Sequence, residues 1–278
     1  MGVGLAAALG LGEREVVSFV GAGGKTTLLM ALARELSERV GRGDLIISTT
    51  TTKVFEPLAG EADSLALGEP EELLAAVDSA PATWRHLALA RARLGPAPVP
   101  GSPGEERVKL EGVEPLLVRR LREHPRVRAV LVEADGARGL PLKAPSPDEP
   151  VIPEASTWVL AVAGADALGA PLDEAHIFRA RRAMELGGLP EGSPVGEELI
   201  ARLLEHPEGF FRGAPAGARR ALCINKVDVA NRFELAREIG YSINARVGAI
   251  EVTLLTSARE REPVYERIGG RETHEARK

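Results

Sequence analysis

The chain has 278 residues, of which 44% are hydrophobic and 27% are charged, and its formal net charge is −5 at pH 7. This composition can bury a substantial core, and the negative charge argues against a nucleic-acid partner, whose affinity would come from neutralised phosphates. Cys223 is the single cysteine, so no internal disulfide can form, and a reducing compartment, the cytoplasm, is expected.

The N-terminal segment, residues 1–16, is apolar but short, and it lacks a basic leading segment. It therefore predicts a packed helix and not a signal peptide. The sequence nowhere approaches the roughly 20 uninterrupted apolar residues of a membrane span, so no membrane partner is expected. The sequence leaves the oligomeric state open.

Strand and helix patterns alternate along the chain. Short apolar runs predict strands at 16–20, 45–48, 87–90, 127–132, 159–163, 221–224 and 249–255. Between them, helices are predicted at 25–40, 70–77, 113–123, 196–205 and 232–245. This alternation is typical of an α/β fold, a mostly parallel sheet flanked by helices.

The domain prediction is a single domain over residues 1–278. An inserted Pro- and Gly-rich excursion is expected around residues 54–112, because the stretch "RLGPAPVPGSPGEER" favours exposed loops. The tail, residues 267–278, is expected to fray. Strand-like runs continue on both sides of the excursion, which favours one domain over two.

A glycine-rich stretch, "VGAGGKTT", joins the first predicted strand to the first long helix. Glycines let backbone N–H groups approach an anion, the helix N-terminus favours negative charge, and a lysine adds a full positive charge. The predicted nucleotide-binding loop consists of Gly21, Ala22, Gly23, Gly24, Lys25, Thr26 and Thr27. Its first glycine is missing relative to the usual phosphate loop, since Phe19 occupies that place; a plain strand-to-helix turn is the alternative.

The second predicted strand ends in a row of threonines followed by a lysine, "ISTTTTKVFEP". Four hydroxyls in a row pack poorly in a core, so this strand end is expected to face a site. The candidates for a second substrate or a switch here are Thr50, Thr51, Thr52 and Lys53. A strand end without any ligand is the alternative.

Two carboxylates, Glu133 and Asp135, end the next buried strand in "VLVEADGARGLPLKAPSPDEPVIP". A P-loop fold places a Mg²⁺-binding carboxylate at such a position, so we expect Mg²⁺ to be held by Thr26 and by Glu133 or Asp135. Beyond them, Arg138 and Lys143 could pair with a phosphate or an anionic partner, or could simply be solvated.

The five histidines show no metal-ligand spacing. In the stretch "DEAHIFRA", His176 and Arg179 are retained as further candidates for a second substrate or a switch.

The stretch Asn225-Lys226-Val227-Asp228 follows a predicted strand in the pattern by which GTP-binding proteins recognise guanine. Asp228 could accept hydrogen bonds from the N1–H and N2 amino groups of guanine, and the Lys226 stem could cover the ring. Ser257 and Ala258, after the last predicted strand, resemble the loop whose backbone N–H contacts the guanine O6. The alternative is a solvated turn with Asp228 as a helix cap, so GTP and ATP both remain open.

Several of these segments together resemble the YqeC family, accessory proteins of selenium-dependent molybdenum hydroxylases: "VVSFVGAGGKTTLLMALARELSERV", "ISTTTTKVFEP", "VLVEADGARGLPLKAPSPDEPVIP", "GADALGAPLDEAHIFRA" and "HPEGFFRGAPAGARRALCINKVD". The likeness runs from about residue 10 to residue 260. It implies a P-loop nucleotide-binding fold and a role in maturing a molybdenum hydroxylase, by making or inserting its selenium-containing cofactor. The implied partners are the hydroxylase or its cofactor-assembly proteins.

The leading functional hypothesis is a hydrolase of GTP or ATP that uses Mg²⁺, with Lys25, Glu133 and Asp135 as its catalytic residues. An ATP-dependent ligase or kinase is the second hypothesis, because the short loop also resembles that of the Mur amide ligases. The third is a binding module that uses nucleotide as a switch with little turnover.

Overall fold

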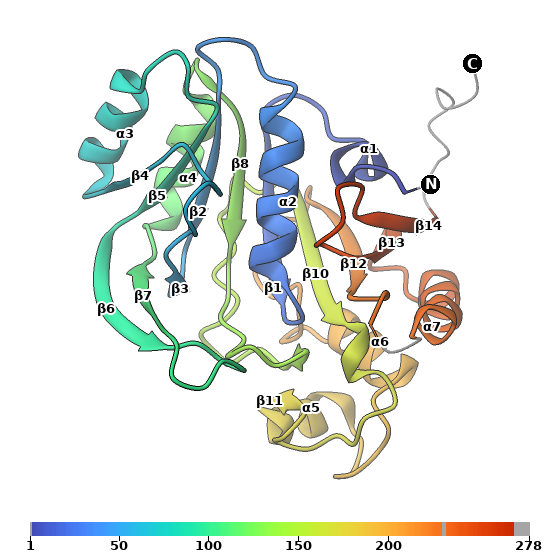
Figure 1. Ribbon diagram of the computed structural model, residues 1–278. Coiled ribbons are helices and arrows are strands. Elements are labelled where there is room, and N and C mark those ends of the chain that lie inside the picture. The colour runs from blue at the N-terminus through green and yellow to red at the C-terminus, as the bar shows by residue number, and fades with distance from the viewer. Residues whose placement is uncertain (1, 230–231, 270–278) are drawn as a thin grey trace, which may run out of the picture.

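A computed structural model describes residues 2–229 and 232–269 of the chain. Within these residues, nine strands form the central sheet of an α/β fold (Figure 1). From edge to edge they are β14 (Val264–Ile268), β13 (Val252–Thr256), β12 (Arg219–Asn225), β10 (Trp158–Gly164), β1 (Glu15–Gly21), β8 (Val127–Glu133), β2 (Leu45–Thr50), β5 (His86–Ala90) and β4 (Ser64–Leu67). All neighbours are parallel except β13 and β14. The predicted fold class is confirmed, and it is consistent with a P-loop NTPase-like domain.

Helices cover both faces of this sheet. They are α1 (Leu5–Leu9), α2 (Lys25–Ser37), α3 (Pro70–Ser79), α4 (Pro115–Glu123), α5 (Ala180–Gly187), α6 (Glu197–Glu205) and α7 (Phe233–Arg246). Successive side chains of a strand point to opposite faces. Accordingly, Val17 and Phe19 of β1 pack with α1 and α2, whereas Val16 packs with α3 and α4 and Val20 joins the core of α6 and α7.

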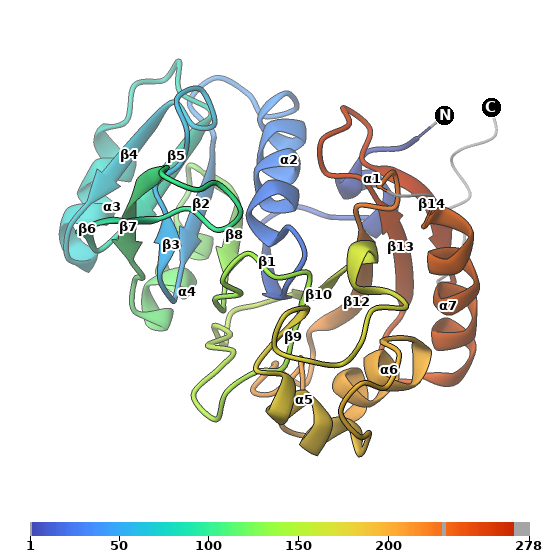
Figure 2. The same ribbon diagram turned by 60° about the horizontal axis from the view of Figure 1, so that its bottom comes forward.

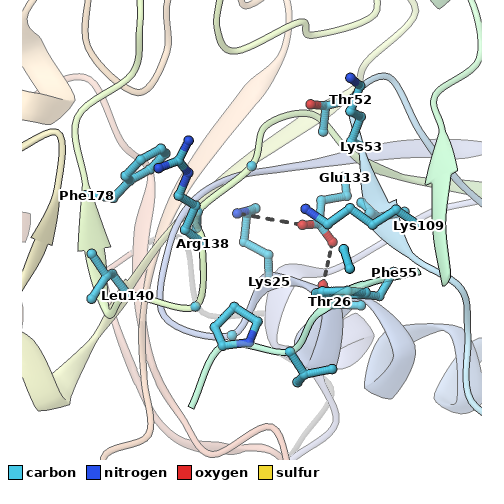
Figure 3. Close-up of a pocket in the computed structure, with 18 of the residues that line it drawn as sticks. Lys25, Thr26, Thr52, Lys53, Phe55, Lys109, Glu133, Arg138, Leu140 and Phe178 are labelled. Atoms are coloured by element: carbon cyan, nitrogen blue, oxygen red, sulfur yellow. Dashed lines mark hydrogen bonds and ion pairs between the residues drawn. The ribbon is translucent and has the colours of Figure 1, made fainter. Parts of the chain in front are cut away.

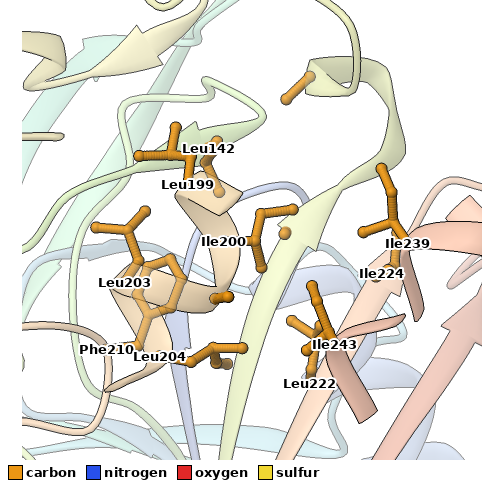
Figure 4. Packing of buried hydrophobic residues seen from close by; sticks show 14 of the residues in the cluster. Leu142, Leu199, Ile200, Leu203, Leu204, Phe210, Leu222, Ile224, Ile239 and Ile243 are labelled. Atoms are coloured by element: carbon orange, nitrogen blue, oxygen red, sulfur yellow. The ribbon is translucent and has the colours of Figure 1, made fainter. Parts of the chain in front are cut away.

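The core beneath α6 and α7 is built from aliphatic side chains of both helices and of β12. Figure 4 shows Leu203 and Ile243 on the helices with Leu222 and Ile224 on the strand. The neighbouring Cys223 points to the opposite face, and burial raises the pKa of its thiol to about 12. Cys223 is thus a core residue and not a nucleophile.

Most predicted elements are present, including the packed N-terminal helix, α1. Several short ones were missed: β4, β14, α5, and the parallel pair β9 (Leu142–Lys143) and β11 (Ile177–Phe178). β9 and β11 have two residues each, too few for a hydrophobic period to be recognised. In the part of the chain that the structure describes, no helix is both long and apolar enough to cross a membrane.

The segment 54–112 is more ordered than the excursion expected there. Its β4 and β5 extend the large sheet, and α3 packs against a face of that sheet. Only β3 (Val54–Phe55), β6 (Ala92–Pro98) and β7 (Glu106–Glu111) leave it, and they form a separate antiparallel sheet in the order β3–β7–β6. The Pro-rich stretch is therefore outside the large sheet, as expected, but backbone pairing makes most of it a hairpin.

The expected frayed tail also begins too early. Arg267 and Ile268 pair with β13 as the end of β14. Residues 270–278, the remainder of the tail apart from Gly269, lie outside the described residues.

The parallel strands end at one edge of the large sheet, toward the bottom of Figure 1 and turned forward in Figure 2. The loops after β1, β2, β8 and β12 all leave from this edge. Ligands of open α/β sheets bind at this edge, near the place where the chain crosses over from one half of the sheet to the other.

Leu116 and Leu121 of α4 provide a matched test of this packing. Leu121 is 0% exposed and Leu116 is 68% exposed. Leu121→Ala should lower the free energy of unfolding by about 2–5 kcal/mol, because it removes buried methyl groups and leaves a cavity. Leu116→Ala should change that free energy by about 0.5 kcal/mol or less. Urea denaturation measures both, and equal losses would contradict the placement of α4.

Candidate functional site

A cleft of about 1090 Å³ opens at the carboxyl edge of the large sheet (Figure 3). Its walls are the loop after β1, the segments that follow β2 and β8, and the antiparallel sheet β3–β7–β6, which we term the second sheet. The residues singled out from sequence that line it are Gly23, Gly24, Lys25, Thr26, Thr27, Thr51, Thr52, Lys53, Glu133, Arg138 and Arg179. The fold thus brings the glycine-rich loop, the threonine row and the loop after β8 to one cleft.

The glycines of the loop are required by backbone geometry and by close packing. Gly21, Gly23 and Gly24 have φ angles of 90°, 85° and 113°. A Cβ at Gly23 would lie 2.2 Å from the backbone nitrogen of Gly164, and one at Gly24 would lie 2.5 Å from Nδ2 of Asn225. Any side chain at Gly23 would therefore push the loop away from β10.

The loop leads directly into α2, whose N-cap is Gly24 with no side-chain cap. The first N–H groups of a helix have no acceptor within the helix, and the helix dipole places partial positive charge there. Because Lys25, Thr26 and Thr27 of this first turn line the cleft, the turn can accept an anion.

Lys25 is buried and paired with acidic groups. Its Nζ lies 2.6 Å from the Gly21 carbonyl oxygen, 3.1 Å from Oδ1 of Asp135 and 3.7 Å from Oε1 of Glu133. Burial alone would lower the pKa of Lys25, but Asp135 and Glu133 outweigh this effect and raise it. Lys25 is therefore a charged ammonium group at the head of α2.

Glu133 and Asp135 differ in their surroundings. The Thr26 hydroxyl donates a hydrogen bond of 2.6 Å to Oε2 of Glu133, which lines the cleft. Oδ2 of Asp135 instead accepts from the Gly21 N–H at 2.9 Å and lies 3.1 Å from Nζ of Lys143. Asp135 thus has its partners within the chain, at the glycine-rich loop and Lys143. Of the two carboxylates, Glu133 is the one that lines the cleft.

Burial raises the pKa of Glu133, and Lys25 opposes this shift without cancelling it. Hydroxyl and carboxylate oxygens are the ligands that Mg²⁺ prefers, so Thr26 and Glu133 fit a Mg²⁺ site. Among residues 2–229 and 232–269, no group of three or more His, Cys, Asp or Glu side chains could hold a metal. A Mg²⁺ ion here would need oxygens of a bound ligand or of water in addition.

Behind the cleft, Lys143 is fully buried and joins Asp135 to Glu149. Its Nζ lies 2.7 Å from Oε2 of Glu149, and Nη1 of Arg179 lies 2.7 Å from the same oxygen. Burial alone would raise the pKa of Glu149, but Lys143 and Arg179 lower it. Lys143, expected to pair with a phosphate or an anionic partner, pairs in this structure with two carboxylates and does not line the cleft.

In the threonine row, Thr50 and Thr51 donate hydrogen bonds to backbone carbonyls, and Thr51 and Thr52 line the cleft. Thr50 is buried and donates to the carbonyl oxygen of Glu133 at 2.8 Å, and Thr51 donates to that of Val151 at 2.6 Å. Thr52 and Lys53 follow and line the cleft. Thr50 therefore holds the strand that carries Glu133.

Asn225 ties the glycine-rich loop to the end of β13. Its buried amide donates to the Gly23 carbonyl at 2.8 Å and accepts from the Thr256 hydroxyl and the Ala258 N–H, each at 3.1 Å. The Ser257 N–H donates a hydrogen bond to the Pro263 carbonyl oxygen. The N–H groups expected to contact guanine O6 thus have partners within the chain.

Lys226 and Asp228 take no part in these hydrogen bonds of Asn225. Nζ of Lys226 lies 2.7 Å from Oδ2 of Asp166, and Asp228 is exposed. The interpretation of Asp228 as a helix cap is wrong, because α7 begins at Phe233 with Arg232 as its N-cap. None of these residues lines the 1090 Å³ cleft; with Asn225, they lie on the β12 side of the loop.

His176 does not line the cleft, and its Nδ1 lies 2.7 Å from Oδ1 of Asp173. Other lining residues were not anticipated as site residues: Phe55, Lys109, Glu149 and Phe178. The charged groups of Arg179 and Arg138 lie 4.4 Å and 5.1 Å from the centre of the Phe178 ring. Phe178 directly precedes Arg179 in the sequence, and this neighbour could have suggested it as a site residue. Lys109 has no such local signal, because it reaches the cleft only through the pairing of β7 in the second sheet.

Comparison with known proteins agrees with these motifs. A family model described as "YqeC protein" matches residues 17–181. The Escherichia coli (strain K12) protein described as "Uncharacterized protein YqeC" is 36% identical over 212 residues, which cover 76% of this chain and 75% of that protein. The search of solved structures gave no match. The chain belongs to the YqeC family.

Proposed function

We propose that this chain binds a Mg²⁺–nucleoside triphosphate at the loop 21–27 and hydrolyses it. The observation that carries the proposal is the hydrogen bond between Thr26 and Glu133 beside Lys25. It lies where the glycine-rich loop ends and α2 begins. A hydroxyl, a carboxylate and an ammonium group meet there, and these are the groups that a P-loop uses on metal and phosphate.

In this proposal, the first-turn N–H groups of α2 and the Lys25 ammonium bind the phosphate oxygens. Lys25 would share its charge between the phosphates and the carboxylates that now hold it. Thr26 would be a Mg²⁺ ligand, and Glu133 would orient Thr26 or hold a water of the metal shell. When bound, Mg²⁺ would neutralise charge on the β- and γ-phosphates.

GTP is the proposed nucleotide and ATP the alternative. Asp228 supports GTP, because it is an exposed carboxylate that follows β12, the strand whose Asn225 touches the loop. Guanine offers a carboxylate two adjacent donors, and adenine does not. A contact from the Ala258 N–H to guanine would require that group to leave Asn225.

A ligase or kinase that uses ATP is the second candidate. It is favoured by the size of the cleft, which exceeds the roughly 300–1,000 Å³ of most small-molecule sites. A nucleotide-switched binding module is the third. Release of phosphate from GTP and ATP, measured with the protein alone and with candidate acceptors, separates hydrolysis, transfer and binding without turnover.

For the biological role, we propose maturation of a selenium-dependent molybdenum hydroxylase, by making or inserting its selenium-containing cofactor. This part of the proposal rests on the family resemblance. The hydroxylase, or the proteins that assemble its cofactor, would be the partners.

Glu133→Gln and Asp135→Asn should have different effects. Glu133→Gln should change stability less, because Lys25 keeps Asp135 as its nearer counter-charge, but it should weaken Mg²⁺-dependent GTP binding about 10- to 100-fold. Asp135→Asn should cost about 3–5 kcal/mol of stability, because Lys25 and Lys143 lose a buried counter-charge. Urea denaturation and GTP titrations with and without Mg²⁺ measure these effects. Mild, equal effects of both substitutions would contradict the proposed roles.

Recognition of guanine can be tested by thermal unfolding. At about 100 times its Kd, Mg²⁺-GTP should add about 2.7 kcal/mol, a shift in Tm of roughly 5 to 10 °C, and Mg²⁺-ATP at the same concentration should give less. Asp228→Asn should weaken GTP and favour xanthosine triphosphate, whose C2 oxygen accepts from the new amide. The guanine proposal fails if ATP and GTP give equal shifts and Asp228→Asn leaves the base preference unchanged.

The maturation role predicts an effect in cells that make both this chain and such a hydroxylase. Deleting the gene for this chain should lower the selenium content of the purified hydroxylase, as measured by inductively coupled plasma mass spectrometry. The wild-type gene should restore that content, and a Glu133→Gln gene should not. Normal selenium content after deletion would contradict the role.

A further inference from the structure

The cleft carries three cations that the proposed nucleotide site does not use, with Arg138 on one side of Lys25 and with Lys53 and Lys109 on the other (Figure 3). Lys53 follows β2, Lys109 lies on β7, and Arg138 lies in the loop after β8. These three residues, which we term the cationic lobe, come from separate segments and line the same cleft (Figure 3).

In the part of the chain that the structure describes, the residues of the cationic lobe form no ion pair with a carboxylate. Across residues 2–229 and 232–269, no carboxylate lies within 4.0 Å of the charged nitrogens of Lys53, Lys109 or Arg138. By contrast, Lys25 and Arg179 are paired with carboxylates. The cleft lining therefore has an excess of cations, five against three carboxylates, in a chain with a net charge of −5.

Aromatic rings hold two of these cations in place. Nζ of Lys109 lies 5.1 Å from the centre of the Phe55 ring, and Cζ of Arg138 lies 5.1 Å from the centre of the Phe178 ring. A ring face attracts a cation but does not accept its strong hydrogen bonds. The donors of Lys109 and Arg138 thus remain available for an anion.

The order of strands separates Lys53 and Lys109 from the expected position of the base. The loop after β1 lies at the middle of the sheet, with β10 and β12 on one side of β1 and β8 and β2 on the other (Figure 2). A nucleotide with its phosphates on the loop and its base at Asp228 extends toward β12. It leaves free the β2 side, where Lys53 lies and where the second sheet brings Lys109.

We propose that the cationic lobe binds a second substrate, a small molecule that carries a phosphate or pyrophosphate group. Cations on two sides of one cleft can contact a group with several charges and oxygens, such as a phosphate or pyrophosphate, better than a single carboxylate. The inference rests on the proposed function, since it assigns the part of the cleft that the nucleotide leaves free.

The test is titration calorimetry with inorganic pyrophosphate on protein saturated with Mg²⁺ and a non-hydrolysable GTP analogue. The variant Lys53→Ala/Lys109→Ala/Arg138→Ala should bind pyrophosphate about tenfold or more weakly than wild type, because charge-assisted contacts are lost. Its affinity for the analogue should stay within about twofold. The matched control, Arg42→Ala/Arg85→Ala/Arg119→Ala, removes three exposed cations outside the cleft and should behave as wild type in both titrations.

Wild-type affinity for pyrophosphate in the triple variant would overturn the inference. So would absence of pyrophosphate binding to saturated wild type together with weaker analogue binding in the triple variant, since the cations would then serve the nucleotide itself. If wild type binds no nucleotide, the proposed function fails separately. The pyrophosphate titration is then run on the nucleotide-free protein, where loss of binding in the triple variant but not in the control still supports the cationic lobe.

Discussion

The carboxylate of Asp135 holds three parts of the site together. It lies at the centre of the carboxyl edge, fully buried, and accepts the Gly21 N–H at the start of the glycine-rich loop. It also pairs with Lys25 of α2 and with Lys143 of β9. A buried charge is tolerated only when it is paired and hydrogen-bonded, so loop, helix and β9 are bound to one geometry.

Asp135 belongs to a larger set of balanced charges. The cations Lys25, Lys143 and Arg179 alternate with the carboxylates Glu133, Asp135 and Glu149 in a chain of contacts. This inner set is formally neutral and orders the walls of the cleft. The excess positive charge of the cleft lining therefore comes from the cationic lobe, and the first turn of α2 adds partial positive charge.

The parallel sheet explains why residues so distant in sequence meet. Strand ends β8, β1 and β10 are neighbours at one edge, and β12 is next to β10, so Glu133, Gly21 and Asn225 come together there. Asn225 then fits against the loop only because position 24 is glycine. Fold and site geometry are thus coupled through close backbone contact.

Much of this could be read from the sequence, because the signals are local. Buried parallel strands appear as apolar runs, a strand–glycine–lysine–helix order marks the glycine-rich loop before α2, and Glu133 follows a buried strand directly. Pairing partners leave no local signal. Sequence therefore left Glu133 and Asp135 equivalent, treated Lys143 as a cation available to a phosphate or an anionic partner, and overlooked Glu149 and Lys109.

Only the tertiary structure decided these points, because the packing around a charged group decides whether it is paired within the chain or accessible to a ligand. Asp135 is committed because Gly21, Lys25 and Lys143 reach it from other segments, which leaves Glu133 to face the cleft. Lys109 enters the cleft because β7 pairs with β3, and a two-residue strand that pairs with a distant segment leaves no hydrophobic period in the sequence. The chain alone determined the loop, its lysine and the class of fold; long-range packing determined which charges are available.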